Sequence, residues 1–336
     1  MELDPSFRHV NRIAQNAAPA FRYDGQADFS LWQKVGKETL SDLLGMCAFE
    51  RCEDDFTVEF QTEHSDFTEI RFTFKSEADY TVPCHILIPR HGEKPFVPVI
   101  CLQGHSTGMH ISLGRAKYPN DESDIYDGDR DIAIRSVKEG CAAITIEQRY
   151  MGEQGGTEKG PSCYSAACAA MLYGRTAVGE RVWDIMRLID VLENHFDSLD
   201  MGRLVVLGNS GGGTSTFYTA CLEERVFCAV PSCSVCTYKD SIAAMRHCCC
   251  NYIPHIGEYF DMGDLAGLIA PRKLVVVNGA EDTIFPKKGV DETMETIRSL
   301  YRSAGAPDNV CLVTGSGGHR FYADLAWSEI HRYIGR

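Results

Sequence analysis

The spacing of apolar residues divides the chain into a helical N-terminal part and a longer part built on strands. An apolar face at helical spacing, with Asp28 as a cap and Gly45 as a stop, predicts a helix from residue 28 to about residue 44. Apolar and polar residues then alternate over residues 68–74 and again over 82–88. This period of two predicts an antiparallel pair of half-buried strands.

Near-continuous apolar runs follow, and helical patterns separate most of them. The runs cover residues 97–102, 141–146, 204–207, 226–230, 274–277 and 310–313. The helical patterns cover residues 132–138, 182–192, 215–222, 290–301 and 322–333. Buried strands that alternate with helices predict an α/β fold with a doubly wound, mostly parallel sheet and antiparallel N-terminal strands. Residues with chemical roles are expected at the carboxyl ends of the parallel strands.

Two long segments interrupt this alternation, at about 148–178 and 232–270. Both leave the edge of the sheet where chemistry is expected, so they are predicted to be binding loops or lids. Residues 1–64 are assigned to an N-terminal arm and helical extension, which packs on the main domain or on a neighbouring subunit. Residues 65–336 are assigned to the main α/β domain.

The strongest chemical motif is G-x-S-x-G at residues 208–212, with Ser210 at its centre. It follows an apolar run and precedes a helical pattern, which is the strand–turn–helix context of a nucleophile elbow. Ser210 is therefore predicted to be a nucleophile. The N–H of Gly211, at the start of a helix, is predicted to donate to an oxyanion. The alternative is a glycine-rich turn with a passive serine.

An acid and a histidine follow this motif in the order Ser…Asp…His, each just past its own apolar run. His319, at the end of a glycine-rich loop, is predicted to be the general base. Asp282 is predicted to orient His319. Its neighbour Glu281 competes for that role, and a helix cap is the structural alternative for Asp282. Other histidines compete for the base role: His105, His110 and His255.

The second oxyanion donor is expected in the turn after the run at residues 97–102. That turn reads Gln103-Gly104-His105, and Gly104 permits a close approach of the backbone. The N–H of His105 is therefore the predicted donor, with a plain tight turn as the alternative. Two such donors typically contribute on the order of 10²–10³ in rate each.

With these motifs the chain resembles the serine esterases of the α/β-hydrolase superfamily, in the branch of acetyl xylan esterases, cephalosporin-C deacetylases and dienelactone-hydrolase-like proteins. The resemblance covers about residues 65–336 and includes Gly174-Arg175 and the charged helical segment at residues 179–190. It implies an α/β-hydrolase fold, a catalytic domain over residues 65–336, and hydrolysis of short acyl esters. The implied substrates are acetyl esters of carbohydrates or related small molecules.

The chain departs from that branch at two places. The oxyanion turn has Gln103 before Gly104, where the branch usually has His-Gly. The strand at residues 141–146 is followed by Glu147-Gln148-Arg149-Tyr150, where the branch often has Asp-x-Arg-Gly. Both departures leave the residues predicted for catalysis intact, and they weaken any transfer of substrate identity.

Two other functions fit the same motifs. A serine peptidase of the prolyl-oligopeptidase kind shares the domain and the order of the motifs, but the chain shows no N-terminal propeller repeat. A catalytically inactive α/β-hydrolase that serves as a binding module belongs to a different class. The complete set of Ser210, Asp282 and His319 argues against this second rival.

Charge and composition restrict the partners. The net charge of −14 argues against nucleic acid and anionic membranes. No stretch is apolar over the length of a bilayer, and residues 1–5 lack the pattern of a secretory signal. The chain has 15 cysteines, an odd number, and several of them lie within apolar runs. Both observations favour a reducing, cytoplasmic location. The expected partner is a small-molecule ester, and association into a homo-oligomer stays open.

No cofactor and no metal are predicted. The sequence His247-Cys248-Cys249-Cys250 has the residue types of a metal site, but adjacent cysteines cannot readily all face one tetrahedral ion. The acidic run at residues 121–131 fails the spacing of an EF-hand and is predicted to be a solvated loop.

Overall fold

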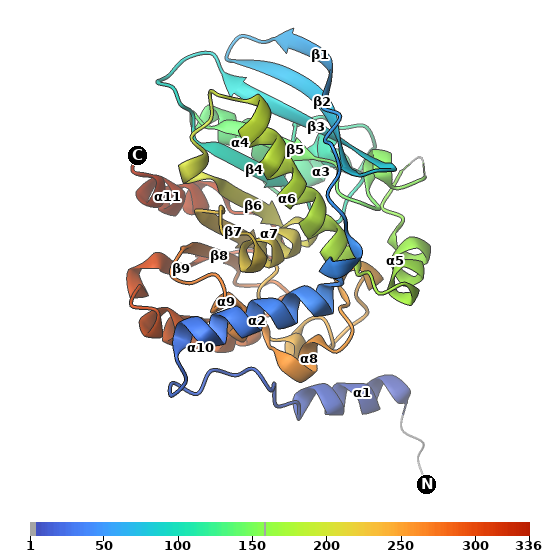
Figure 1. Cartoon of the computed structure of the whole chain (residues 1–336), viewed down its shortest axis with the longest axis vertical. Helices are drawn as coiled ribbons and strands as arrows, with labels where there is room; N and C mark the ends of the chain where they lie inside the picture. Colours follow the sequence, from blue (N-terminus) through green and yellow to red (C-terminus); the bar gives the residue numbers. More distant parts are fainter. Residues whose placement is uncertain (1–4, 158) are drawn as a thin grey trace.

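The computed structural model describes residues 5–157 and 159–336; residues 1–4, part of the N-terminal segment considered above, and residue 158, within the 148–178 segment, lie outside it. In the described residues, nine strands form one sheet in the order β1-β2-β3-β5-β4-β6-β7-β8-β9 (Figure 1). The strands are β1 Thr57–Glu63, β2 Phe67–Glu77, β3 Tyr80–Pro89, β4 Pro98–Leu102, β5 Ala142–Ile146, β6 Val205–Asn209, β7 Cys228–Ser232, β8 Lys273–Gly279 and β9 Val310–Gly315.

The sheet has an antiparallel part and a parallel part. β1, β2 and β3 are antiparallel neighbours, and β3 also pairs antiparallel with β5. From β5 to β9 along the sheet, every neighbouring pair is parallel. This arrangement confirms the predicted sheet and its antiparallel N-terminal strands. β1 is not among the predicted strands, although Val58 and Phe60 alternate with polar residues there; both side chains are exposed on this edge strand.

Helices cover both faces of the sheet (Figure 1). α2, α6, α7, α9 and α10 share one apolar core with one face, and α4 and α11 share a second core with the other face. None of the helices in the described ranges is long and apolar enough to cross a membrane. The helices are α1 Ser6–Gln15, α2 Phe29–Leu44, α3 Asp121–Tyr126, α4 Ile132–Lys138, α5 Cys163–Leu172, α6 Ala177–His195, α7 Gly211–Leu222, α8 Ile256–Tyr259, α9 Met262–Ala266, α10 Lys287–Ser303 and α11 Ala323–Ile334.

The order of strands reverses between β4 and β6. The strand after β4 in the chain, β5, lies on one side of β4, and the later strand β6 lies on its other side. In α/β sheets such a switch point opens a crevice at the carboxyl edge, where ligands bind. Ser210 follows β6, and the turn Gln103-Gly104-His105 follows β4, so both lie at this crevice.

The predicted N-terminal helix is confirmed as α2. The side chain of Asp28 accepts a hydrogen bond from the N–H of Leu31, and Gly45 ends the helix in the left-handed conformation at φ 77°. Its buried residues are Trp32, Gly36, Leu40 and Leu44. α1, in contrast, buries no residue. The sheet begins with β1 at Thr57, before residue 65, so its first strand lies in the segment assigned to the N-terminal extension.

The acidic run at residues 121–131 differs from its prediction as a solvated loop. Its first residues form α3, and Asp121 is buried. The Asp121 carboxylate accepts hydrogen bonds from the N–H groups of Lys117 and Tyr118, and its Oδ2 lies 2.9 Å from Nε2 of His110. A carboxylate with such partners can be buried. The charge pattern misleads here because the partners lie outside the run.

Gly212 lies where the first turn of α7 crosses the end of β4. A Cβ atom at Gly212 would overlap the carbonyl oxygens of Leu102 and Gln103, which are backbone atoms with little freedom to move. We expect Gly212→Ala to lower the free energy of unfolding by about 1–3 kcal/mol, as overpacking does, measured by urea denaturation. Gly257→Ala is the matched control, because a Cβ there meets no atom within 4 Å. Equal losses in both variants would contradict the explanation from close contact.

Candidate active site

Ser210 occupies the sharp turn between β6 and α7. Its backbone has φ 54° and ψ −120°, a conformation that residues other than glycine rarely adopt. Its N–H donates to the carbonyl oxygen of Ser232 at the end of β7, at 2.8 Å. On the other side, a Cβ at Gly104 would lie 3.4 Å from Cβ of Ser210. The strand–turn–helix geometry expected for residues 208–212 is therefore present.

Asp282 and His319 form a hydrogen-bonded pair at the same edge of the sheet, after β8 and β9. Nδ1 of His319 lies 2.8 Å from Oδ2 of Asp282. Oδ1 of Asp282 accepts hydrogen bonds from the N–H groups of Ile284 and Phe285. Burial raises the pKa of Asp282, but the hydrogen bond and charge of His319, with these N–H groups, bring it below its usual value. An ionised Asp282 therefore holds the imidazole by Nδ1 and leaves Nε2 for a third group.

The end of β7 lies next to both Ser210 and the Asp282–His319 pair. Ser232 accepts the N–H of Ser210, and the next residue is Cys233. The sulfur of Cys233, a carboxylate oxygen of Asp282 and a ring nitrogen of His319 all lie within 4.8 Å of one another. The hydroxyl of Ser210 donates no hydrogen bond to another described residue. In substrate-free enzymes such bonds are often long, and they tighten when substrate binds.

The rival residues from the sequence lie in other surroundings. Glu281 is exposed to solvent. His110 and His255 each pair with a different carboxylate, at 2.9 Å in both cases. Nε2 of His105 lies 3.3 Å from the sulfur of Cys163. The structure thus brings His319, and none of these three histidines, to Asp282.

The two predicted oxyanion donors are neighbours. A Cβ at Gly211 would lie 3.2 Å from the backbone nitrogen of His105, so the turn after β4 touches the first residue of α7. Neither N–H donates to an acceptor within the described ranges. Unpaired N–H groups at the start of a helix attract negative charge. The arrangement can hold an oxyanion beside Ser210.

An aromatic side chain that the catalytic motifs do not single out borders His319. The ring of Phe285 stacks on that of His319, with centroids 5.9 Å apart and planes 17° apart. On Phe285 in turn packs His247, with ring centroids 5.8 Å apart in a T-shaped arrangement. Burial lowers the pKa of His247, against the charge of Cys250, and the charges of His319 and His105 lower it further. No sequence signal marks Phe285, whereas His247 was visible only as part of the cysteine-rich segment.

Arg149, in the segment at residues 147–150 that stands where the related esterases often have Asp-x-Arg-Gly, has a structural role. Arg149 donates hydrogen bonds to both carboxylate oxygens of Asp184 on α6, at 2.7 and 2.8 Å, and one to Glu77 at the end of β2, at 2.6 Å. Burial lowers the pKa of Arg149, but Asp184 and Glu180 raise it well above its usual value. This network fixes the start of the 148–178 segment to α6 and to the sheet.

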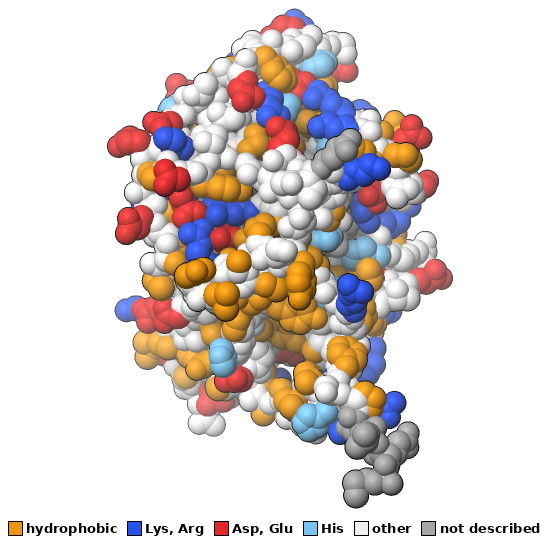
Figure 2. All heavy atoms as spheres, turned by 90° about the vertical axis from the view of Figure 1, so that its right-hand side faces the viewer, with side chains coloured by type: hydrophobic (Ala, Val, Ile, Leu, Met, Phe, Trp, Pro, Cys, Tyr) orange, Lys and Arg blue, Asp and Glu red, His pale blue; other side chains and the backbone are white. Residues whose placement is uncertain are grey.

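The 148–178 segment also carries an apolar surface. α5 exposes the large side chains of Tyr164 and Leu172, and Tyr173, directly after the helix, is exposed as well. Figure 2, which faces the side of the molecule that carries α5, shows hydrophobic side chains gathered near its middle, with charged ones around them. A separate cavity of about 300 Å³ lies beneath the N-terminal arm and is lined partly by Asn251 and Tyr252, and Ser210 does not line it.

Side chains that could bind a metal also converge at this edge. A ring nitrogen of His105 and the sulfurs of Cys163, Cys248 and Cys250 lie within 4.8 Å of one another. The prediction of no metal weighed the adjacent cysteines of the 232–270 segment and the acidic run at residues 121–131. It did not include Cys163, which lies far from both in the sequence.

A mostly parallel sheet, a strained serine turn after β6, and an Asp–His pair after β8 and β9 define an α/β-hydrolase fold. Solved structures confirm this fold. The chain is similar to a "putative acetyl xylan esterase" from Bacteroides fragilis, with a TM-score of 0.77 and 17% identity over 99% of this chain and 90% of that one. It is also similar to a glucuronoyl esterase from Solibacter usitatus, with a TM-score of 0.69 and 14% identity over 96% and 98% of the two chains.

Comparison of sequences also finds a protein named as a hydrolase among those similar to this chain. The chain is 24% identical over 245 residues to "Putative hydrolase YtaP" of Bacillus subtilis, which covers 70% of this chain and 77% of that protein. No family model matches the chain. At these identities the similarity establishes the fold that the sequence predicts. The chemistry rests on the side chains of the site itself.

Proposed function

We propose that this chain is a serine hydrolase of carboxylic esters, with Ser210 as nucleophile, His319 as general base and Asp282 as the residue that orients His319. The hydrogen bond between Asp282 and His319, beside a strained serine turn and two unpaired N–H groups, carries this proposal. A glycine-rich turn and an aspartate that caps a helix are each common features, and neither alone indicates catalysis. Their convergence at one sheet edge is the arrangement that acyl transfer requires.

In the first half of the reaction, His319 Nε2 takes the proton of the Ser210 hydroxyl as the oxygen attacks the acyl carbon. The carbonyl oxygen becomes an oxyanion and accepts hydrogen bonds from the N–H groups of Gly211 and His105. His319 then gives its proton to the alcohol oxygen, and the alcohol leaves. Asp282 stabilises the imidazolium that forms between these two steps.

In the second half, water hydrolyses the acyl-enzyme. His319 takes a proton from the water, whose oxygen attacks the acyl carbon while the same two N–H groups hold the new oxyanion. The bond to the Ser210 oxygen breaks, and that oxygen takes the proton back from His319. One ester and one water thus give one acid and one alcohol, and the enzyme is restored.

The structural relatives support esters as the substrate class. Their names specify acetyl xylan esterases, glucuronoyl esterases and a methylesterase. We propose short acyl esters, such as acetyl groups on carbohydrates, as the substrates of this chain. Exposed Tyr164 on α5 and Tyr173 directly after it offer ring faces of the kind that pack against the apolar side of a sugar.

A substrate panel tests this proposal. We expect the protein to hydrolyse p-nitrophenyl acetate and to release acetate from acetylated xylo-oligosaccharides, and to leave aminoacyl p-nitroanilides uncleaved. Initial rates under identical conditions give kcat/KM for each. Preferred cleavage of the anilides would replace the esterase with a peptidase. A folded protein that neither reacts with a fluorophosphonate probe nor hydrolyses any ester would instead be a binding module.

The composition supports finer proposals on location and partners. A cytoplasmic location suits a chain in which none of the 15 cysteines, all of them in the described ranges, forms a disulfide. The acidic net charge suits a small-molecule partner better than nucleic acid or an anionic membrane. Whether copies associate through the N-terminal arm can be measured by analytical ultracentrifugation.

A further inference from the structure

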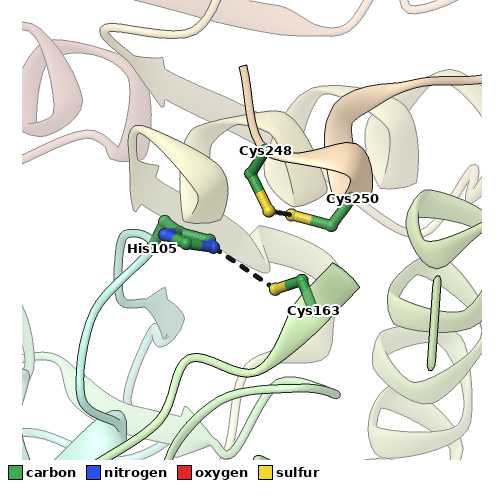
Figure 3. A group of neighbouring side chains, drawn as sticks. All are labelled: His105, Cys163, Cys248 and Cys250. Carbon is green, nitrogen blue, oxygen red and sulfur yellow. Dashed lines mark hydrogen bonds between the residues drawn. The ribbon is translucent and has the colours of Figure 1, made fainter. Parts of the chain in front are cut away.

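A cluster of three cysteines and one histidine lies beside the oxyanion turn (Figure 3). His105 comes from the turn after β4, Cys163 is the first residue of α5, and Cys248 and Cys250 flank the start of the short 3₁₀ helix η6, Cys249–Asn251. Figure 3 shows the four side chains pointing toward one another from these three segments. We propose that they form a structural zinc site.

The distances suit a tetrahedral ion. Nε2 of His105 is 3.3 Å from the sulfur of Cys163, the sulfurs of Cys248 and Cys250 are 3.2 Å apart, and all four atoms lie within 4.8 Å of one another. Zinc binds sulfur at about 2.3 Å and imidazole nitrogen at about 2.0–2.1 Å, which separates tetrahedral ligand atoms by about 3.5–3.8 Å. Small rotations of these side chains therefore reach the geometry of a Cys₃His site.

The charge around the cluster suits a zinc–thiolate group. Arg181 of α6 is buried, and among residues 5–157 and 159–336 no carboxylate oxygen lies within 4.0 Å of its guanidinium. Its Nη2 donates to the carbonyl oxygen of Arg149 at 3.0 Å and lies 3.8 Å from the sulfur of Cys163. A buried cation needs a compensating negative charge. Three thiolates, a neutral imidazole and Zn²⁺ sum to −1, which matches the charge of Arg181.

Zinc uptake by this cluster is coupled to the loss of thiol protons. Zinc binds thiolate rather than thiol, so uptake of one Zn²⁺ releases three protons to solvent if all three cysteines begin as thiols. His105 is exposed, which gives the ion a path into the cluster.

The spacing in the sequence conceals this site. Cys248 and Cys250 are two residues apart and converge, whereas Cys249 between them is outside the cluster. The proposed site therefore does not require adjacent cysteines to share one ion, because Cys249 is not a ligand. The third and fourth ligands come from segments that only the fold brings near. Four protein ligands leave no open position, so the ion is structural.

The ion would tie both insertions to the turn that carries the backbone N–H of His105. If the proposed ester hydrolysis is correct, the zinc site also holds in place one of the two oxyanion donors, the N–H of His105. The zinc proposal itself does not depend on that activity, since metal content and spectroscopy measure it directly. A protein that binds zinc and hydrolyses no ester would refute only the proposed function.

The test uses the untagged full-length chain purified without chelator. We expect about one zinc per chain by inductively coupled plasma mass spectrometry. Replacement by Co²⁺ should give thiolate-to-cobalt charge-transfer bands and the strong visible bands of a tetrahedral site. Cys163→Ser and Cys250→Ser should lose most of the zinc and these bands, whereas Cys249→Ser, the matched control, should keep both.

A second measurement needs no variant, because the serine variants can fail to fold. Alkylation of wild-type protein, read by mass spectrometry, should spare Cys163, Cys248 and Cys250 when zinc is bound and modify them after chelation. Cys249 should react equally in both states. Folded wild-type protein with no zinc and no cobalt–thiolate bands would overturn the proposal. A disulfide among the three cysteines in the freshly purified protein would overturn it as well.

Discussion

Replacing Ser210 by alanine is expected to lower kcat for p-nitrophenyl acetate by about 10⁵–10⁶-fold, because nucleophile, base and orienting residue act as one unit. The loss should appear in kcat and kcat/KM alike, since the hydroxyl acts in the bond-making step. Labelling by a fluorophosphonate probe should also disappear, because the probe forms a bond to the same oxygen. The residual rate should be that of substrate held beside the two unpaired N–H groups.

Ser303→Ala is the matched control for this experiment. Ser303 ends α10, is exposed, and its hydroxyl donates only to the carbonyl oxygen of Ser299 one turn earlier. This variant should keep full activity and full labelling, and both variants should keep the circular dichroism spectrum of the wild type. If Ser210→Ala retained activity within tenfold of wild type, the nucleophile would have to be another residue.

Replacing Asp282 by asparagine is the second large effect, an expected loss of about 10⁴-fold in kcat. Oδ2 of Asp282 accepts from Nδ1 of His319 at 2.8 Å, which keeps the proton on Nδ1 and leaves Nε2 as the base. An asparagine amide at that position can donate to Nδ1 and so favour the wrong tautomer. Its volume is nearly the same, so the fold should change little. Steady-state kinetics with p-nitrophenyl acetate gives the loss.

Glu281→Gln separates this role from a general loss of negative charge. The change removes the same unit of charge one residue earlier, at an exposed position. It should alter kcat by less than about threefold, as surface substitutions away from a site do. A large effect in Glu281→Gln with little effect in Asp282→Asn would give the orienting role to Glu281. Equal moderate effects would indicate long-range electrostatics in place of a specific hydrogen bond.

The regular elements followed from the sequence wherever burial imposed a period. The helix at 28–44 was predictable because Asp28, Gly45 and a buried apolar face act together, and the structure reproduces all three. The parallel strands β4, β5, β6 and β7 were predictable because they are buried on both faces. β1 was not predicted, although Val58 and Phe60 alternate with polar residues; this short alternation lies on an exposed edge strand. Its pairing with β2 is decided by backbone hydrogen bonds, which leave little trace in side-chain type.

Parts of the site followed from local geometry in the same way. The elbow at residues 208–212 was predictable because Gly212 must let α7 cross β4 closely, and that requirement is written into the motif. His110 and Asp121 illustrate the opposite case. Their buried pair joins two segments whose local sequence indicates a loop, and its formation depends on partners that no local pattern specifies.

The amino-acid order alone determined the α/β class, the antiparallel start of the sheet and the positions of Ser210, Asp282 and His319 after their strands, because each depends on a short-range period or motif. Only the tertiary structure decided which histidine meets Asp282, and that His105 lies with three cysteines beside buried Arg181. The physical reason is that side chains from loops meet through the paths of several connections at once. Contacts between such distant segments are set by the packing of the whole sheet and its helices, and no spacing within one segment encodes them.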